Sequence, residues 1–223
     1  MSRKQADHVC PPFIGYFLLA NPLRRLLYTP SSIVGAYVRE GMTVIEPGPG
    51  MGFFTIELAR LVGASGRVVA LDIQPKMLRA IAQRAERADL LGLVDLRLIE
   101  NDSLGINDLK GKADFFLAFA MVHEVPNPRQ FFKEAFASLK SGARLLLVEP
   151  KGHVSEQLYR QELGYAETAG FRVESRPAIR MSRATLLVKK QGTQGQRSRS
   201  IHRNRDKGGS RKVARKRPLL GRD

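Results

Sequence analysis

The sequence predicts an α/β fold in which a mostly parallel sheet of seven strands lies between two layers of helices. Short apolar runs alternate with segments of helical periodicity along most of the chain, which is typical of parallel strands joined by crossover helices. Three alternating glycines follow the first apolar run, and the last two runs are joined too closely to leave room for a helix. These observations indicate a covered sheet with a ligand-binding corner after its first strand and one reversed strand at its end.

The first five strands are expected where apolar residues cluster between turn residues, at 43–46, 67–71, 94–99, 114–119 and 144–149. Helical periodicity separates these strands at residues 53–62, 76–90, 129–139 and 156–168. Pro75 suits the first turn of the second helix, whose apolar stripe we assign to core packing.

Two strand-like runs end the fold, at residues 171–176 and 184–188, with a short proline-containing connection between them. Because a crossover helix does not fit in this connection, the two strands are expected to pair antiparallel. A mostly parallel sheet with a reversed last strand differs from the usual dinucleotide-binding domain.

Composition divides the chain into three parts. A length of 223 residues with 43% hydrophobic content supports one substantial core. We predict an N-terminal helical cap at residues 1–40, a folded domain at residues 41–190 and a basic tail at residues 191–223. The tail carries eleven Lys or Arg against two Asp, which is +9 of the net charge of +16. Because it is rich in Gly, Ser and Arg and poor in apolar residues, we expect it to be disordered when alone.

The composition also excludes several classes of protein. The single cysteine, Cys10, excludes an internal disulfide and a cysteine-cluster zinc site, and no metal site is predicted. The apolar runs at residues 13–20 and 115–122 are each eight residues long, short of the ~20 residues that span a bilayer. No secretory leader is recognisable, so we expect a soluble, cytoplasmic protein.

The glycine corner predicts a nucleoside-containing ligand. Gly48, Gly50 and Gly52 lack the Cβ atoms that would keep a ligand from the backbone, and the helix that follows points its free N–H groups at this corner. A dinucleotide fingerprint requires a third glycine at position 53, where this chain has Phe53. Asp72 ends the second strand, twenty residues after Gly52, where a carboxylate can accept hydrogen bonds from two ribose hydroxyls.

In their order along the chain, these motifs resemble those of the class I S-adenosylmethionine-dependent methyltransferases, which have a Rossmann-like fold. The resemblance covers residues 41–189 and implies S-adenosyl-L-methionine as the cofactor. Residues at the family's cofactor-binding positions are Glu46, Gly48, Pro49, Gly50, Gly52 and Phe53 at the methionine end, Asp72 at the ribose, Ile73 and Met77 beside the adenine, Asn101, Asp102 and Ser103 in the third motif, and Ala118 and Phe119 in the fourth.

The chemistry of methyl transfer requires alignment of donor and acceptor more than it requires a base. Where the acceptor must lose a proton, His123 and Glu124 are the candidate catalytic residues, because they follow the fourth strand at its ligand-facing end. The fourth motif lacks the Asn/Asp-Pro-Pro-aromatic sequence of enzymes that methylate exocyclic nitrogens. The chain more closely resembles the small-molecule branch, in which an N-terminal cap, here residues 8–28, supplies the acceptor pocket.

Two alternatives remain open at the level of the sequence. The chain could be an RNA-directed methyltransferase or a nucleic-acid-binding protein that uses residues 191–223 for phosphate contacts, although this tail has no aromatic side chain to stack on bases. It could also be an NAD-dependent oxidoreductase built on the same strand, glycine and helix unit. Phe53 and the reversed final strand disfavour this second alternative.

Overall fold

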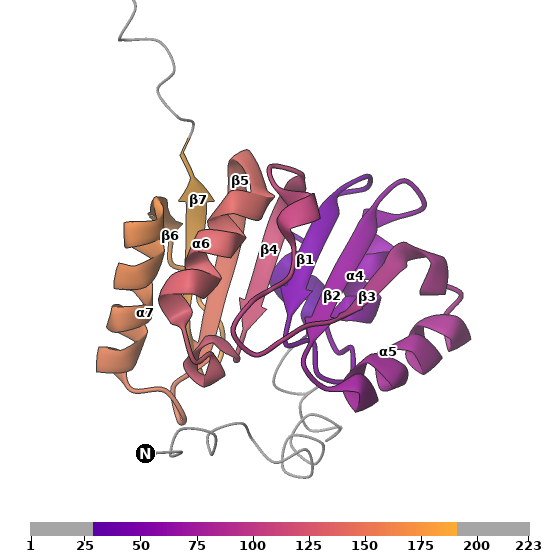
Figure 1. The fold of residues 1–223 in the computed structure, drawn as a ribbon, viewed down its shortest axis with the longest axis horizontal. Helices are drawn as coiled ribbons and strands as arrows, with labels where there is room; N and C mark the ends of the chain where they lie inside the picture. The colour runs from indigo at the N-terminus through magenta and orange to yellow at the C-terminus, as the bar shows by residue number, and fades with distance from the viewer. Residues whose placement is uncertain (1–28, 191–223) are drawn as a thin grey trace, which may run out of the picture. The chain divides into compact units, whose positions relative to one another are not determined.

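A computed structural model describes residues 29–190, which form a seven-stranded sheet with helices on both faces (Figure 1). The strands are β1 (Thr43–Pro47), β2 (Arg67–Asp72), β3 (Val94–Leu98), β4 (Ala113–Phe119), β5 (Leu139–Pro150), β6 (Phe171–Ser175) and β7 (Ser182–Lys189). The helices are α3 (Pro30–Val34), α4 (Thr55–Val62), α5 (Pro75–Arg87), α6 (Pro128–Ser138) and α7 (Glu156–Ala169), with short 3-10 turns η1 (Leu91–Leu93), η2 (Asn107–Leu109) and η3 (Val122–Glu124). Most of the expected N-terminal cap and all of the basic tail lie outside the described residues.

The strand order is β3-β2-β1-β4-β5-β7-β6, and the sheet confirms the predicted fold class. Every neighbouring pair from β3 to β5 is parallel, whereas β7 pairs antiparallel with both β5 and β6. The arrow of β7 accordingly points opposite to that of β4 in Figure 1. The last strand therefore does not add to the edge of the sheet but is inserted between β5 and β6.

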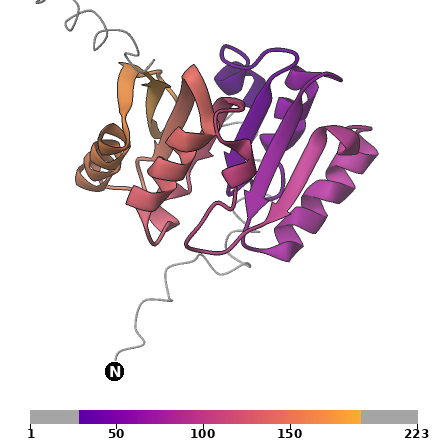
Figure 2. The ribbon, with the colours of Figure 1, turned by 45° about the horizontal axis from the view of Figure 1, so that its top comes forward.

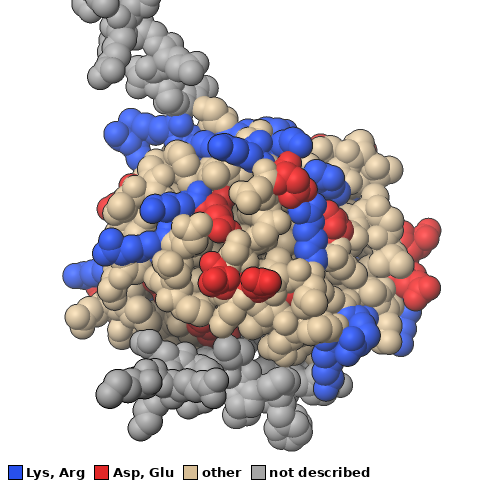
Figure 3. Space-filling model, viewed as in Figure 1, with Lys and Arg blue, Asp and Glu red and all other residues tan. Residues whose placement is uncertain are grey.

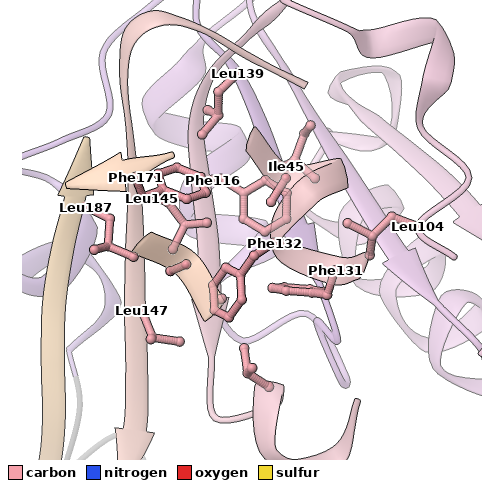
Figure 4. Close-up of a cluster of buried hydrophobic side chains, with 14 of the residues drawn as sticks. Ile45, Leu104, Phe116, Phe131, Phe132, Leu139, Leu145, Leu147, Phe171 and Leu187 are labelled. Atoms are coloured by element: carbon pink, nitrogen blue, oxygen red, sulfur yellow. The ribbon is translucent and has the colours of Figure 1, made fainter. Parts of the chain in front are cut away.

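The core has two layers, one on each face of the sheet. On one face α6 and α7 pack against each other over a cluster that includes Phe116, Phe132 and Phe171, all nearly inaccessible to solvent (Figure 4). On the other face α3 and α4 cover a second cluster around Leu58 and Phe115. Figure 2 shows the twisted sheet between these helices. Successive side chains of a strand point to opposite faces of the sheet, so the consecutive residues Phe115 and Phe116 pack into opposite layers of the core.

Local sequence sets the ends of the helices. Asn127 caps α6 by accepting from the N–H of Gln130, and Ser155 caps α7 by accepting from the N–H of Leu158. The second predicted helix ends earlier than expected, at Arg87, because the backbone turns at Asp89 into the left-handed region with a φ of 56°. Strand β5 begins five residues earlier than expected, where Leu139 pairs with Ala113 across an irregularity in the ladder.

The parallel strands β1, β2, β4 and β5 end at one edge of the sheet, and this edge positions the candidate site. The N–H of Gly48, after β1, donates to the carbonyl of Leu71 in β2 at 2.9 Å, so the loops that follow the two strands start side by side. Ligands of open parallel sheets bind at this carboxyl edge, where the strand order reverses. Within residues 29–190, no helix combines the length and the apolar content needed to cross a membrane.

Candidate functional site

The loop after β1 contains three glycines in a conformation that other residues rarely adopt. Gly48, Gly50 and Gly52 have φ angles of 62°, 57° and 81°, all in the left-handed region. A Cβ atom added at Gly48 would lie 3.0 Å from Cβ of Met121, and one at Gly52 would lie 3.2 Å from Cγ1 of Ile81. The glycines therefore let the loop turn sharply and pack closely against Met121 and Ile81.

Glu46 lies near the end of β1, two residues before Gly48, and is buried, with 3% of its surface exposed. Its Oε2 accepts a 2.7 Å hydrogen bond from Oγ1 of Thr55, the first residue of α4. This bond joins the end of β1 to the start of α4 across the glycine loop. The sequence did not single out Thr55, although a hydroxyl residue at the start of a helix opposite a buried acid is a readable signal.

Asp72 ends β2 and is also buried, at 7% exposure. Its Oδ1 accepts from the N–H of Gln74 at 2.8 Å. The pKa of Asp72 is raised to about 6, chiefly by burial and to a smaller extent by the negative charge of Glu124. Hydrogen bonds from the backbone N–H groups of Gln74 and Ile73 lower this pKa but do not offset the effect of burial. This carboxylate thus comes within electrostatic reach of the turn that follows β4.

The residues of the third motif lie after β3 and show two different environments. Asn101 and Asp102 are exposed and make no side-chain hydrogen bond within the described part of the chain. Ser103 is half-buried, and its hydroxyl donates to Oε1 of Glu134 in α6 at 3.2 Å. The same carboxylate accepts from the N–H of Leu104 at 2.6 Å, so α6 fixes the direction in which the loop leaves β3.

Apolar residues assigned to the cofactor differ in how far they are buried. Met77 faces inward from α5 with 4% of its surface exposed, and Ile73 is half-buried. Ala118 is fully buried in the core, while Phe119 retains 9% exposure at the end of β4. The ring of Phe119 lies 4.5 Å from that of Phe54, centroid to centroid, and the more exposed ring of Phe53 packs edge-on against Phe54 at 5.2 Å. Pro49, within the glycine loop, is buried.

The backbone is strained where the chain leaves β4. Ala120 has a φ of 55°, which is uncommon for a residue with a Cβ atom, and its N–H donates to the carbonyl of Val148 at 2.7 Å. Strained residues of this kind often lie at functional sites. The turn at Ala120 directs η3, and therefore His123, across the carboxyl end of β5.

His123 is held by a buried carboxylate from β5. Its Nδ1 lies 2.7 Å from Oε2 of Glu149, whose Oε1 accepts from the N–H of Val122 at 2.8 Å. Nε2 of His123 lies 3.8 Å from Oε1 of Glu124, and its ring meets that of His153 edge-on at 4.8 Å. With Nδ1–H donating to Glu149, Nε2 carries the lone pair that can accept a proton.

The carboxylates around His123 also set its charge. Burial lowers the pKa of His123, but the hydrogen bond that it donates to Glu149 and the negative charges of Glu149, Glu124 and Glu162 outweigh the effect of burial, so the pKa is raised. Glu149 is fully buried and was not singled out from the sequence. Its position at the carboxyl end of the fifth strand is the signal that could have identified it, because that end faces the site.

The structure thus places the glycine loop, Asp72 and His123 at one edge of the sheet, at the ends of β1, β2 and β4. Three left-handed glycines and a buried carboxylate on adjacent strand ends fit a ligand that carries a ribose and lies against the backbone. Among residues 29–190, no cluster of three or more His, Cys, Asp or Glu side chains could hold a metal ion. The assignment of individual residues to parts of the cofactor stays a prediction.

Comparison with known proteins identifies the protein family to which this chain belongs. The model of a methyltransferase domain family matches residues 38–192. The ubiquinone/menaquinone biosynthesis C-methyltransferase UbiE of Pasteurella multocida is 30% identical over 112 residues, which are 50% of this chain and 41% of that protein. The enzyme of the same name from Cronobacter sakazakii is 29% identical over 129 residues, 58% of this chain and 51% of that protein. The chain therefore aligns with about half the length of these curated relatives.

Solved structures agree with the sequence matches at the level of the fold. A SAM-dependent methyltransferase from Aquifex aeolicus superposes with a TM-score of 0.71 at 24% identity, covering 81% of this chain and all of that one. The family match, the seven-stranded sheet with its reversed β7 and the glycine loop after β1 lead to the same assignment. The chain belongs to the class I S-adenosylmethionine-dependent methyltransferases.

Proposed function

We propose that this chain transfers the methyl group of S-adenosylmethionine to a small-molecule acceptor by in-line displacement. The observation that carries the proposal is the glycine loop after β1, which lies beside the buried Asp72 at the end of β2. When bound, the cofactor supplies an electrophilic methyl group on a sulfonium. The chain itself has to position the two reactants and exclude water, because the transferred carbon is already activated.

The environment of His123 supports an acceptor that loses a proton. Glu149 fixes the imidazole through Nδ1, which leaves Nε2 as the atom that would take the proton. The relatives from P. multocida and C. sakazakii are named C-methyltransferases of quinone biosynthesis. An aromatic carbon becomes a good nucleophile when a neighbouring hydroxyl is deprotonated, so we propose a hydroxylated ring as the acceptor class, with His123 as the base and Glu149 as its positioning residue.

The proposal is tested first on the donor and then on the acceptor. Calorimetric titration of the full chain with S-adenosylmethionine, S-adenosylhomocysteine and NAD should show binding of the first two ligands. Binding of NAD with no binding of S-adenosylmethionine would contradict the proposal. A screen of phenolic and quinol compounds with methyl-labelled cofactor then identifies the acceptor, and RNA in the same screen tests the alternative substrate.

Replacing Asp72 should weaken cofactor binding and change its dependence on pH. The pKa of Asp72 is about 6, so the carboxylate that accepts from ribose hydroxyls is present above that pH and lost below it. Asp72→Asn should lower the affinity by about 10-fold to 100-fold at pH 7.5, the range expected for hydrogen bonds to a charged group. The affinity of the wild type should also fall as the pH drops through about 6, and that of the variant should not.

Glu86→Gln, an equal loss of charge at an exposed position on α5, is the matched control and should leave the titration unchanged. Calorimetry at pH 5, 6, 7 and 8 measures both effects. An Asp72→Asn variant with wild-type affinity at pH 7.5 would mean that the ribose lies elsewhere.

A second candidate function, methylation or binding of RNA, is favoured by the +9 charge of residues 191–223. The face of the folded domain seen in Figure 3 carries both signs of charge, so it offers no single basic surface of its own. Deletion of residues 191–223 should leave cofactor binding and the activity on a small acceptor unchanged. If salt-sensitive RNA binding and the activity are lost together, RNA is the substrate and the small-molecule proposal is wrong.

A further inference from the structure

Helix α7 buries a glutamate for which residues 29–190 provide no hydrogen-bond partner. Glu162 is 2% exposed, and neither of its carboxyl oxygens is bonded within the part of the chain that the structure describes. It lies in the same stripe as Tyr159, Leu163 and Ala166, the residues by which α7 packs on the core. A position of this kind normally holds an apolar side chain, because a buried charge without partners is strongly destabilising.

The surroundings of Glu162 connect it to the candidate site. Helix α7 packs against η3, which carries His123, and Glu162 interacts electrostatically with both His123 and Glu149. The hydroxyl of Tyr159, one turn earlier on α7, donates to Oγ1 of Thr185 in β7 at 2.8 Å, so its proton is not available for a hydrogen bond to Glu162. Among the described residues, four other titratable or charged groups lie around His123, Glu149 and Glu162. Glu124 and His153 lie beside His123. Arg183 donates to the carbonyl of Val154, and the positive charge of Arg176 lowers the pKa of Tyr159.

Two carboxyl groups therefore share one buried region with a single imidazole. Glu149 accepts two hydrogen bonds, from Val122 and His123, which is the arrangement of an ionised carboxylate. Glu162 accepts none from the described residues, and burial together with the charge of Glu149 raises its pKa to about 8, against the opposing effect of His123. As long as His123 is neutral, Glu162 is thus an uncharged carboxylic acid at neutral pH, and a positive charge on His123 favours loss of its proton.

We propose that Glu162 is a positioning residue for His123. Glu162 gives up its own proton when the imidazole of His123 becomes charged, so that two carboxylates, Glu149 and Glu162, stabilise the imidazolium. The inference rests on the proposed function in taking His123 as the base. The proton that leaves the acceptor bonds to Nε2 of His123, and Glu162 releases its own proton to solvent. Later transfer of the proton from His123 to the carboxyl pair restores the resting state, with one proton released for each methyl group transferred.

The test measures the titration of the His123 imidazole by NMR on the full chain labelled with 15N-histidine, without any cofactor. His123→Asn identifies the signal by its disappearance. In Glu162→Gln the side chain cannot ionise, so His123 should titrate at lower pH than in the wild type. Glu162→Asp, which keeps the carboxyl group, should recover at least part of the difference, and Glu167→Gln at an exposed position of the same helix should cause none. Identical titration of His123 in the wild type and Glu162→Gln would overturn the inference.

A second measurement needs no variant to fold. Infrared difference spectra of the wild type between pH 6 and pH 9 should show the loss of a protonated carboxylic acid, and absence of that band would also overturn the inference. Failure of the proposed function is recognised separately, by calorimetry with S-adenosylmethionine. A chain that binds the cofactor but shows no coupling between Glu162 and His123 refutes only the role of Glu162, whereas coupling without cofactor binding refutes only the function.

Discussion

Gly50→Val should abolish the binding of S-adenosylmethionine while the domain remains folded. Gly50 has a φ of 57°, and a β-branched residue is poorly tolerated there because its side chain crowds the backbone. The substitution also adds a branched side chain to the loop after β1, where the cofactor is expected to lie. We expect the affinity to fall by at least about 100-fold, or ~2.7 kcal/mol, as measured by calorimetry.

Gly111→Val is the matched control for this variant. Gly111 has a φ of 67°, close to that of Gly50, and an added Cβ atom would meet nothing within 4 Å. It precedes β4, at the end of the strand opposite to the site. Both variants should lose roughly 1–2 kcal/mol of stability from the left-handed conformation, but only Gly50→Val should lose the cofactor. Equal cofactor binding by the two variants would show that the glycine loop is not the cofactor site.

The fold class could be predicted from the sequence because each feature that indicates it involves residues that are close together in the chain. Apolar runs of strand length, the short connection before the last strand and the glycines after β1 all depend on neighbouring residues in the chain. The position of β7 between β5 and β6 was not predicted, because it depends on which strand edges remain available after the parallel part of the sheet has formed. The acceptor pocket was expected at residues 8–28, which lie outside the described residues.

The candidate site was only half predictable, for a different physical reason. Gly48, Gly50 and Asp72 belong to short motifs that specify their own conformation. Glu149 holds His123 because the strained turn at Ala120 directs η3 across β5, and an alanine carries no sequence signal for a φ of 55°. This part of the site is assembled by contacts between residues that are far apart in the sequence.

Glu162 shows both limits of sequence reasoning. Helical spacing alone places Glu162 in the stripe with Tyr159, Leu163 and Ala166, so its burial could have been read from the sequence. The missing hydrogen-bond partner and the closeness of Glu149 could not, because they arise from the packing of α7 on η3 and the sheet. A residue that violates the pattern of its own helix without local compensation is where a functional explanation should be sought.

Glu162→Leu should stabilise the protein, and the gain should grow with pH. The pKa of Glu162 is raised from 4.5 to about 8 on folding, chiefly by burial. Below pH 4.5 the side chain is protonated in both the folded and the unfolded chain. Between these two values only the unfolded chain releases the proton, so this residue lowers the free energy of unfolding as the pH rises, by roughly 3 kcal/mol up to pH 7. Above about pH 8 both states are ionised and the loss no longer grows.

Leucine removes this pH-dependent loss and completes the apolar stripe of α7, so urea denaturation should show a larger gain in the free energy of unfolding at pH 8 than at pH 5. Glu167→Leu, at an exposed position on the same helix, should show no such difference between the two pH values. An equal gain for Glu162→Leu at pH 5 and pH 8 would mean that the pKa of Glu162 is not raised by folding. If Glu162→Leu is more stable than the wild type and Glu162→Gln also shifts the titration of His123, the buried acid lowers the stability of the protein but changes the charge of His123. That combination is expected for a group whose ionisation contributes to the function of the site and not to the stability of the core.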